Sequence, residues 1–369
     1  MKEKITSYQF LAIMFLAPYG TASLFFTTPE TKNDVWIALL FYAFTSIIIQ
    51  MIYVNLFNKY PKDSIVTYLP KIYGKYIGFI LSVIYIYFFA YDAARGLRDF
   101  TELTSSFALI RMPVYIIVSV FMIIVTYSVY KGIENIGNMA QMGFLIVIAS
   151  TIIIYMLLFM TQNSLHFESL FPILHKGFID VISKGWKLST FPYGEFVVMT
   201  MLYSFLLQKN ELKKTIISAS IIEGISLALN NILFIAALGY ELASSSDYPL
   251  LETLRLVHIG DFLNRLDIIF VVVLMLGGFF KISILMYASV LGISQLFKIK
   301  NWGLLCSVLG IIISITSLII AENNPEHINI GWNYVLVYFF PFVVVIIPLL
   351  SLIVYYIKKF IVGIHAPTK

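Results

Sequence analysis

The sequence predicts an all-α polytopic membrane protein with ten transmembrane helices, folded as a single integral membrane domain over 1–369. Of its 369 residues, 60% are hydrophobic and only 12% are charged, a balance that soluble domains do not have. Many apolar runs exceed the roughly 18 residues that suffice to cross a bilayer. These runs are continuous rather than alternating, which excludes a transmembrane β-barrel. Two of them are interrupted by the same tripeptide, Pro-Tyr-Gly, which predicts breaks in two spans.

Ten apolar segments define the expected spans. They cover 7–28, 34–57, 77–107, 113–130, 139–160, 186–208, 215–239, 266–297, 302–321 and 334–357. The third and eighth are long enough that we expect them to tilt or to protrude from the bilayer. The first segment follows Lys2 and Lys4 and resembles a signal peptide. Because apolar sequence continues through Leu24-Phe25-Phe26, we expect it to be a transmembrane span instead.

Positive charges gather in the segments that ten spans place on one side of the membrane. These segments contain Lys2, Lys4, Lys59, Lys62, Lys71, Lys75, Lys131, Lys209, Lys213, Lys214, Lys298, Lys300, Lys358, Lys359 and Lys369. Because positively charged loops stay in the cytoplasm, both termini are predicted to be cytoplasmic. The two long outer loops, 161–185 and 240–265, carry short amphipathic patterns, so we expect helices that lie along the membrane surface.

The two Pro-Tyr-Gly copies lie in the first and sixth expected spans. Pro18-Tyr19-Gly20 and Pro192-Tyr193-Gly194 each remove a backbone donor and lower helix propensity in mid-membrane. The two spans run in opposite directions, so 7–160 and 186–357 are candidate inverted repeats. Interrupted spans at matching positions of inverted halves are typical of the LeuT-type transporter plan. The alternative is that both copies are simple proline kinks, which are common in membrane helices.

A resemblance to a known family rests on Phe-Pro-Tyr-Gly-Glu at 191–195, together with the ten spans and the broken first span. In these features the whole chain resembles the B subunits of spore germinant receptors, permease-like proteins of the amino acid–polyamine–organocation superfamily. The resemblance implies a LeuT-type fold in the inner membrane of a dormant spore. It also implies assembly with an A and a C subunit, and binding of a small nutrient such as an amino acid.

The two breaks would expose backbone groups to a small ligand. A half-helix beginning near Thr21 would direct free N–H groups at a carboxylate, and free carbonyls near Phe191 would accept hydrogen bonds from an ammonium group. Tyrosines of the third span would face the breaks if that span lines the site, although packing against other helices is the alternative. The candidate ligand-binding residues are Gly20, Thr21, Ala22, Tyr87, Tyr91, Phe191, Gly194 and Glu195.

Among the ionisable residues inside expected spans, Glu195, Lys281 and Glu223 are candidates for a functional role, because charges there are costly and usually functional. Glu195 starts the inner half of the sixth span, where it either contacts ligand or caps the helix. Lys281 lies in the middle of the eighth span and either substitutes for a bound cation, carries a proton, or pairs with Glu195 or Glu223. Glu223 lies near the start of the seventh span, where a structural hydrogen bond is the alternative to a coupling role.

The third span carries five charged residues at helical spacing. Spacings of three and four place Asp92, Arg95 and Asp99 on one face, and Arg98 with Glu102 on another. Internal pairing would lower the cost of holding these charges at membrane depth. Asp92 and Arg95 are therefore candidates for a coupling or charge-pair role, with a solvated helix end as the alternative for Arg98 and Glu102.

Catalytic and metal sites are not expected. The single cysteine, Cys306, excludes an internal disulfide and a cysteine-based metal site. The histidines lie outside the expected spans, at His166, His175, His258, His327 and His365. The sequence contains no phosphate-binding loop, nucleophile elbow or paired catalytic carboxylates. We therefore expect no enzyme activity and no cofactor, and the positive charges beside the spans require no nucleic acid partner.

Two functions remain open on these residues. One is a nutrient-sensing, permease-like subunit that binds a small molecule between the first, third, sixth and eighth spans. The other is a proton-coupled secondary amino acid transporter, which would use the same site. The residues alone slightly favour transport, whereas the resemblance favours the sensing subunit.

Overall fold

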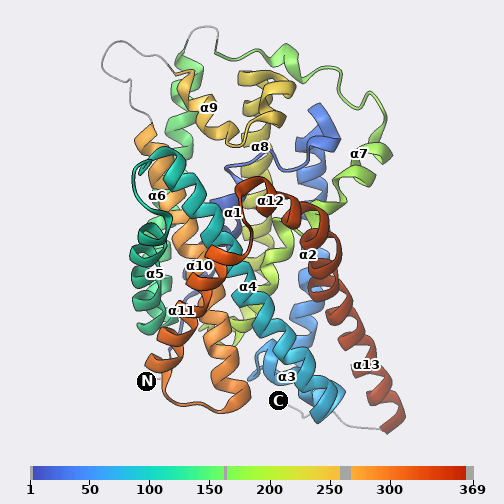
Figure 1. The fold of residues 1–369 in the computed structure, drawn as a ribbon. Helices are drawn as coiled ribbons and strands as arrows, with labels where there is room; N and C mark the ends of the chain where they lie inside the picture. Colours follow the sequence, from blue (N-terminus) through green and yellow to red (C-terminus); the bar gives the residue numbers. More distant parts are fainter. Residues whose placement is uncertain (1–2, 162–163, 258–266, 363–369) are drawn as a thin grey trace.

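The computed structural model describes residues 3–161, 164–257 and 267–362, and the regular elements named in these ranges are all helices (Figure 1). The α-helices are α1 (Ser7–Ala22), α2 (Val35–Lys59), α3 (Ile65–Tyr73), α4 (Lys75–Phe107), α5 (Val114–Tyr130), α6 (Ile133–Met160), α7 (Phe178–Gly185), α8 (Leu212–Ser245), α9 (Pro249–Arg255), α10 (Asp267–Phe297), α11 (Trp302–Ile319), α12 (Asn324–Ile330) and α13 (Ile347–Val362). Short 3-10 helices include Pro29–Asp34, Trp186–Ser189, Tyr193–Met201 and Tyr203–Phe205, and π-helical turns cover Gly331–Phe339 and Phe342–Ile346. The expected start of the eighth span, at 266, lies outside the described residues.

The described residues contain seven helices that are long and apolar enough to cross a membrane. They are Pro29–Lys59, Lys75–Ser106, Ile133–Met160, Lys209–Ser245, Phe270–Phe297, Trp302–Ile319 and Asn324–Ile361. Each overlaps an expected span, and the shorter apolar helix α5, with 17 residues, overlaps another. The first and sixth expected spans are the two that the structure interrupts. The predicted fold class, a polytopic helical protein with a broken first and sixth span, is therefore confirmed.

Helix α1 lies inside the bundle, where it packs against α10, α6 and α8. A capping box starts it: Thr6 Oγ1 accepts a hydrogen bond from the backbone N–H of Gln9 at 3.2 Å, and the Gln9 side chain accepts one from the backbone N–H of Thr6 at 2.8 Å. Every residue from Ala12 to Ala22 is buried. A helix that is buried on all faces belongs to the core of a bundle, and α1 forms the centre of this one.

The outer helices present apolar side chains outward. Ile123 on α5, Ile311 on α11 and Ile353 on α13 are all exposed. Figure 1 shows α5 and α11 on one flank of the bundle and α13 on the other, with α4 crossing the front. Lipid tails can cover such apolar faces, so this exterior fits the hydrocarbon layer of a bilayer.

The first span is interrupted later than the sequence suggests. Helix α1 continues through Pro18 and ends at Ala22, after which the chain runs without helix to Thr28. The backbone N–H of Ser23 donates to the carbonyl of Tyr19 at 3.0 Å and closes the last helical turn. The expectation of a half-helix that begins near Thr21 is therefore wrong: Thr21 lies in the last turn of a helix, where carbonyls rather than N–H groups are left free.

Gly20 has a packing role that explains its place in the tripeptide. The backbones of α1 and α10 touch at Gly20 and Gly277, and a Cβ built on Gly20 would lie only 2.1 Å from the Cα of Gly277. Only glycine permits such an approach of two helix backbones. This contact brings the end of α1 against the middle of α10.

The sixth span is interrupted between Ser189 and Tyr193. Helix α7 and the 3-10 helix Trp186–Ser189 form the outer part, and the inner part is a 3-10 helix, Tyr193–Met201. Pro192 has no N–H, so the helix ends before it, and the backbone N–H of Glu195 donates to the Pro192 carbonyl at 3.1 Å. At its far end this segment pairs with the start of α1, where Ile5 N–H donates to Phe205 O at 3.0 Å and Leu207 N–H donates to Ile5 O at 2.9 Å.

Both amphipathic patterns in the long loops form helices, α7 at Phe178–Gly185 and α9 at Pro249–Arg255. Helix α7 packs on α2, and α9 packs on α8 and α10. Both lie in the upper half of the bundle in Figure 1, α9 at the top and α7 on the right flank. Residues 258–265 of the second loop lie outside the described residues.

Candidate functional site

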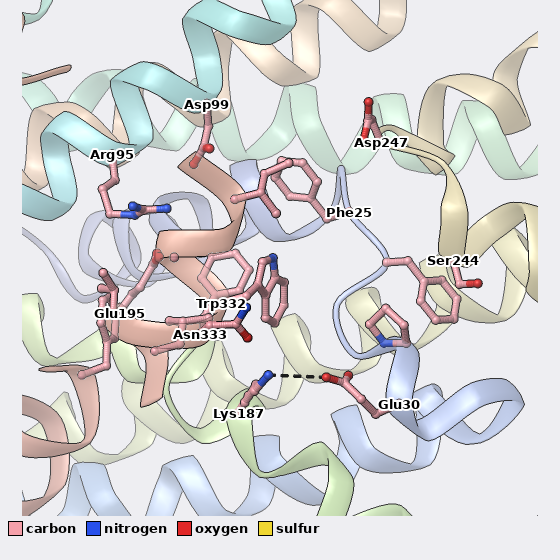
Figure 2. A pocket seen from close by; sticks show the side chains of 18 of the residues that line it. Phe25, Glu30, Arg95, Asp99, Lys187, Glu195, Ser244, Asp247, Trp332 and Asn333 are labelled. Carbon is pink, nitrogen blue, oxygen red and sulfur yellow. Dashed lines mark hydrogen bonds and ion pairs between the residues drawn. The ribbon is translucent and has the colours of Figure 1, made fainter. Parts of the chain in front are cut away.

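A cavity of about 380 Å³ lies between α4, α10, the segment after α1, the interrupted sixth segment and Gly331–Phe340. Its outer end is bordered by Glu30 and Asp247, which are exposed, and its floor by Glu195 and Lys281, which are buried. Figure 2 shows side chains from these separate elements directed toward one space. The cavity therefore connects the surface of the molecule with a buried, charged floor.

The floor is a buried ion pair. Lys281 Nζ on α10 donates to Glu195 Oε1 at 2.6 Å and to Thr21 Oγ1 at 3.1 Å. The ammonium group also lies 5.2 Å from the centroid of the Phe191 ring. Of the two carboxylates expected as partners of this lysine, Glu195 is the one in contact. One side chain thus links α10 with both interrupted spans.

Local sequence explains how these groups meet. Lys281 lies four residues after Gly277 and therefore on the same face of α10, the face that touches α1. Glu195 lies in the first turn after the break at Pro192, where the free N–H groups of the inner segment favour a carboxylate. The glycine contact and the proline break together place the two charges side by side.

The wall formed by α4 carries three charged residues of the cavity, Asp92, Arg95 and Asp99. Arg95 Nη2 donates to the backbone carbonyl of His327 at 2.9 Å, and Asp99 Oδ1 lies 2.8 Å from His327 Nε2. Asp92 is 4% exposed. Its Oδ2 and the Nη1 of Arg95 are buried without a hydrogen-bond partner among the described residues.

The second charged face of α4, with Arg98 and Glu102, makes its contacts away from the cavity. Arg98 and Glu102 form an ion pair at 2.6 Å, and Arg98 Nη1 donates to the carbonyls of Ser317 and Leu318 at the end of α11. Neither charged side chain borders the cavity. This pair fastens α11 to α4 and is a structural contact.

Aromatic side chains form much of the remaining wall. Phe25 and Phe26 come from the segment after α1, Phe191 from the sixth-segment break, and Trp332 and Phe340 from the segment between α12 and α13. Phe191 meets Trp332 edge to face, with ring centroids 6.3 Å apart. The cavity thus combines charged groups at its floor and on one wall with apolar surface elsewhere, as small-molecule sites commonly do.

Some expected ligand-binding residues do not border the cavity. Tyr87 is 58% exposed and stacks on Tyr91, and both rings pack against Phe339. Tyr87 lies five residues before Asp92, about 140° around the helix, so it faces away from the cavity when Asp92 faces it. That angular relation is present in the sequence and distinguishes the two faces of α4.

Three small residues expected at the site, Gly20, Ala22 and Gly194, are packed inside the protein near it. Gly20 contacts Gly277, and Ala22 is fully buried. A Cβ on Gly194 would lie 3.1 Å from the Ser189 carbonyl and 3.4 Å from the Val344 side chain. None of Gly20, Ala22 and Gly194 borders the cavity, whereas Phe191 and Glu195 do. Thr21 reaches it only through its hydrogen bond with Lys281.

Glu223 lies in a separate polar layer on α8. It is 0% exposed, and neither of its carboxylate oxygens has a hydrogen-bond partner among the described residues. Two turns further along the helix, Asn230 donates to Tyr19 Oη at 3.1 Å and accepts from Tyr155 Oη at 2.5 Å. Glu223 is therefore close to the site in the fold but does not border the cavity.

His327 is the main site residue that the sequence did not reveal. It is fully buried on α12, in contact with Asp99, although its position predicted a loop. The signal was the start of α12, where Asn323 accepts a hydrogen bond from the backbone N–H of Glu326 at 3.0 Å and Pro325 follows. Such a cap predicts a short helix with one buried face. His258 and His365 lie outside the described residues, and the described residues hold no cluster of three potential metal ligands.

Comparison with known proteins agrees with this architecture. The family model described as spore germination protein matches residues 4–325. Spore germination protein KB of Bacillus subtilis (strain 168) is 32% identical over 340 residues, which cover 91% of this chain and 90% of that protein.

Two solved structures show the same fold. The crystal structure of MhsT in complex with L-phenylalanine has a TM-score of 0.60 at 14% identity and covers 96% of this chain and 99% of MhsT. Mhp1, a nucleobase-cation-symport-1 family transporter, has a TM-score of 0.56 at 10% identity and covers 89% of this chain and 74% of Mhp1. Both are LeuT-fold transporters, so the chain has a LeuT-type fold. Since the family model spans most of the chain and a member covers nine-tenths of it, this chain belongs to the spore germination protein family.

Proposed function

We propose that the chain is the nutrient-sensing, permease-like subunit of a spore germinant receptor and that it binds an α-amino acid in the cavity above Lys281 and Glu195. The observation that carries the proposal is the buried ion pair at the meeting point of two interrupted spans, beneath a cavity open to the surface. Membrane-buried charges beside a cavity typically mark a substrate site. MhsT, whose fold this chain shares, is described in complex with an amino acid.

The arrangement suggests how binding would act. A ligand that contacts α4, α10 and the sixth segment at once favours the arrangement of helices in which all three contacts are made. Partner subunits would then read this shift in the bundle. The proposal includes A and C subunits as these partners, the spore inner membrane as the location, cytoplasmic termini, and a single membrane domain made of the repeats 7–160 and 186–357.

The test is germination of spores from which only this chain has been deleted. Germination in response to the α-amino acid that the receptor detects should be lost, and should return when the chain is restored. Purified chain should bind the same amino acid, and should co-purify with the A and C subunits. Unchanged germination of the deletion spores to every amino acid tested contradicts the proposal.

A second candidate is a proton-coupled amino acid transporter. Lys281 favours it, because this lysine contacts both interrupted spans from α10, where a bound cation would contact them in an ion-coupled carrier. Proteoliposomes distinguish the two functions. Accumulation of a labelled amino acid against its gradient, driven by an imposed pH gradient, supports the transporter, whereas binding without accumulation supports the sensor.

A further inference from the structure

Two charged residues on one wall of the cavity each have a buried polar atom without a partner within the part of the chain that the structure describes. Asp92 Oδ2 and Arg95 Nη1 are both buried, and neither makes a hydrogen bond. Both residues border the cavity, and Figure 2 shows the Arg95 guanidinium directed from α4 toward it. Buried polar atoms in proteins are nearly always hydrogen-bonded, so such atoms at the edge of a cavity indicate groups that a ligand satisfies.

Most of the other charges around the cavity are paired, and Asp247 lies at its exposed outer end. Lys281 contacts Glu195, Asp99 contacts His327, and Lys187 contacts Glu30 at 3.4 Å. Arg95 differs, because the one hydrogen bond it makes to a described residue is to the neutral backbone carbonyl of His327. Asp92 makes no ion pair with Lys281 or Arg95 among the described residues, and Lys281 pairs with Glu195 instead. On the buried wall of the cavity, one negative residue, Asp92, and one positive residue, Arg95, therefore have no ion pair among the described residues.

These two groups are arranged in order along α4. Asp92 and Arg95 lie three residues apart, so their side chains leave the same face of the helix about 4.5 Å apart along its axis. Arg95 lies next to α12, through its hydrogen bond to the His327 carbonyl, and Asp92 lies about one turn earlier on α4. A ligand that satisfies both must carry a cationic and an anionic group close together.

Building on the proposed function, we propose that Asp92 and Arg95 are the two anchors of the ligand: Asp92 binds the ammonium group of an α-amino acid, and Arg95 Nη1 binds its carboxylate. The side chain of the amino acid then lies against the aromatic wall of Phe26, Trp332 and Phe340. This assignment moves the anchors from the helix breaks to α4. Thr21 cannot offer free N–H groups from the end of α1, and its hydroxyl already contacts Lys281.

The test compares matched ligands on matched variants of the full chain, purified in detergent. Binding of the common L-α-amino acids is measured first by calorimetry. The tightest is then compared with its amide, which lacks the carboxylate charge, and with the acid that lacks the amine. For L-phenylalanine these are L-phenylalaninamide and 3-phenylpropionate. The wild type should bind each analogue about tenfold or more weakly than the amino acid.

Two variants test which residue binds the carboxylate of the ligand and which binds its ammonium group. Arg95→Gln should weaken amino acid binding about tenfold or more and should remove the preference for the acid over the amide. Asp92→Asn should remove the preference for the amino acid over the acid without the amine. Arg98→Gln and Glu102→Gln are the matched controls on the same helix, because their ion pair does not border the cavity, and both should keep the wild-type preferences.

Two results would overturn the inference, and they can be told apart. If the wild type binds an amino acid and both variants keep its full preferences, the anchors are wrong while the proposed function stands. If the wild type binds a neutral hexose such as D-glucose and no amino acid, the proposed ligand class fails as well. If a variant does not fold, the wild-type protein alone tests the inference. Equal wild-type affinity for the amino acid, its amide and the acid without the amine would mean that neither a positive nor a negative residue anchors the ligand.

Discussion

The ammonium group of Lys281 lies 2.6 Å from the carboxylate of Glu195, at the point where α10 meets both interrupted spans. Both side chains are almost fully buried. A buried ion pair is held less by its own attraction than by the high cost of leaving either charge alone. The pair therefore fixes the relative positions of α10 and the sixth segment for as long as both charges are present.

Replacing Lys281 by methionine should lower the free energy of unfolding by about 3–5 kcal/mol, because it leaves Glu195 buried without its partner. Replacing both, as Lys281→Met with Glu195→Gln, should restore most of this loss. Chemical unfolding in detergent micelles measures both values. Lys184→Met is the control, since Lys184 pairs with Asp180 at 2.8 Å on the surface and its loss should cost less than about 1 kcal/mol. A double variant as unstable as the single one would contradict the coupling.

Gly20→Ala should lower the free energy of unfolding by about 1–3 kcal/mol, the usual cost of overpacking a tight contact. The added methyl group would meet the backbone of Gly277, which cannot rotate aside as a side chain can. Gly96→Ala is the control, because a Cβ there lies 3.4 Å from the Lys281 side chain, an ordinary contact. Equal thermal stability of the two variants would show that α1 and α10 do not touch at Gly20.

Glu223→Gln should cause no loss of stability, whereas Asn230→Ala, further along the same helix, should cost about 1–3 kcal/mol. The carboxyl group of Glu223 makes no hydrogen bond among the described residues, so replacing it by an amide breaks no contact. Asn230 bonds to two tyrosines, and its removal leaves both hydroxyl groups short of a partner. Thermal unfolding of the two variants side by side tests the contrast, and a large loss with Glu223→Gln would reveal a required ionised group.

His327→Gln should loosen the segment that forms the outer rim of the cavity. The variant removes the contact between His327 and Asp99, while the Arg95 hydrogen bond to the backbone of residue 327 can remain. Amide hydrogen exchange should become faster over 324–333 and stay unchanged in α5. His166→Gln is the control because that side chain is exposed. Unchanged exchange in the rim would mean that the histidine contact does not hold it.

The span pattern could be predicted because the bilayer requires about 20 consecutive apolar residues per helix, and this requirement is visible in the sequence. The charged residues Lys281 and Glu195 stood out for the same reason, since ionisable groups in a span are rare. The choice between Glu195 and Glu223 as partner of Lys281 could not be made. It depends on how α8 and the sixth segment are placed around α10, which is a tertiary property.

The break in the first span was misplaced because proline in a helix removes only one hydrogen bond, and the surrounding packing kept Pro18 helical. His327 was missed because a polar stretch between two apolar ones reads as a loop, even when one of its side chains is buried. Trp332 and Phe25 could not be selected among many aromatic residues, since only the folded chain shows which of them meet. Tyr87 could have been excluded, because its position opposite Asp92 follows from helix geometry alone.

The backbone contact between Gly20 and Gly277 leaves no compressible side chain between α1 and α10 at that level. Helix α1 also packs against α10 elsewhere, but at Gly20 the two backbones touch, so a tilt of α1 relative to α10 would have its pivot there. The cavity lies on one side of this pivot, and the pairing of Ile5 with the end of the sixth segment lies on the other. A tilt of α1 caused by a ligand at the cavity would therefore be reproduced, in the opposite direction, at the far end of the bundle.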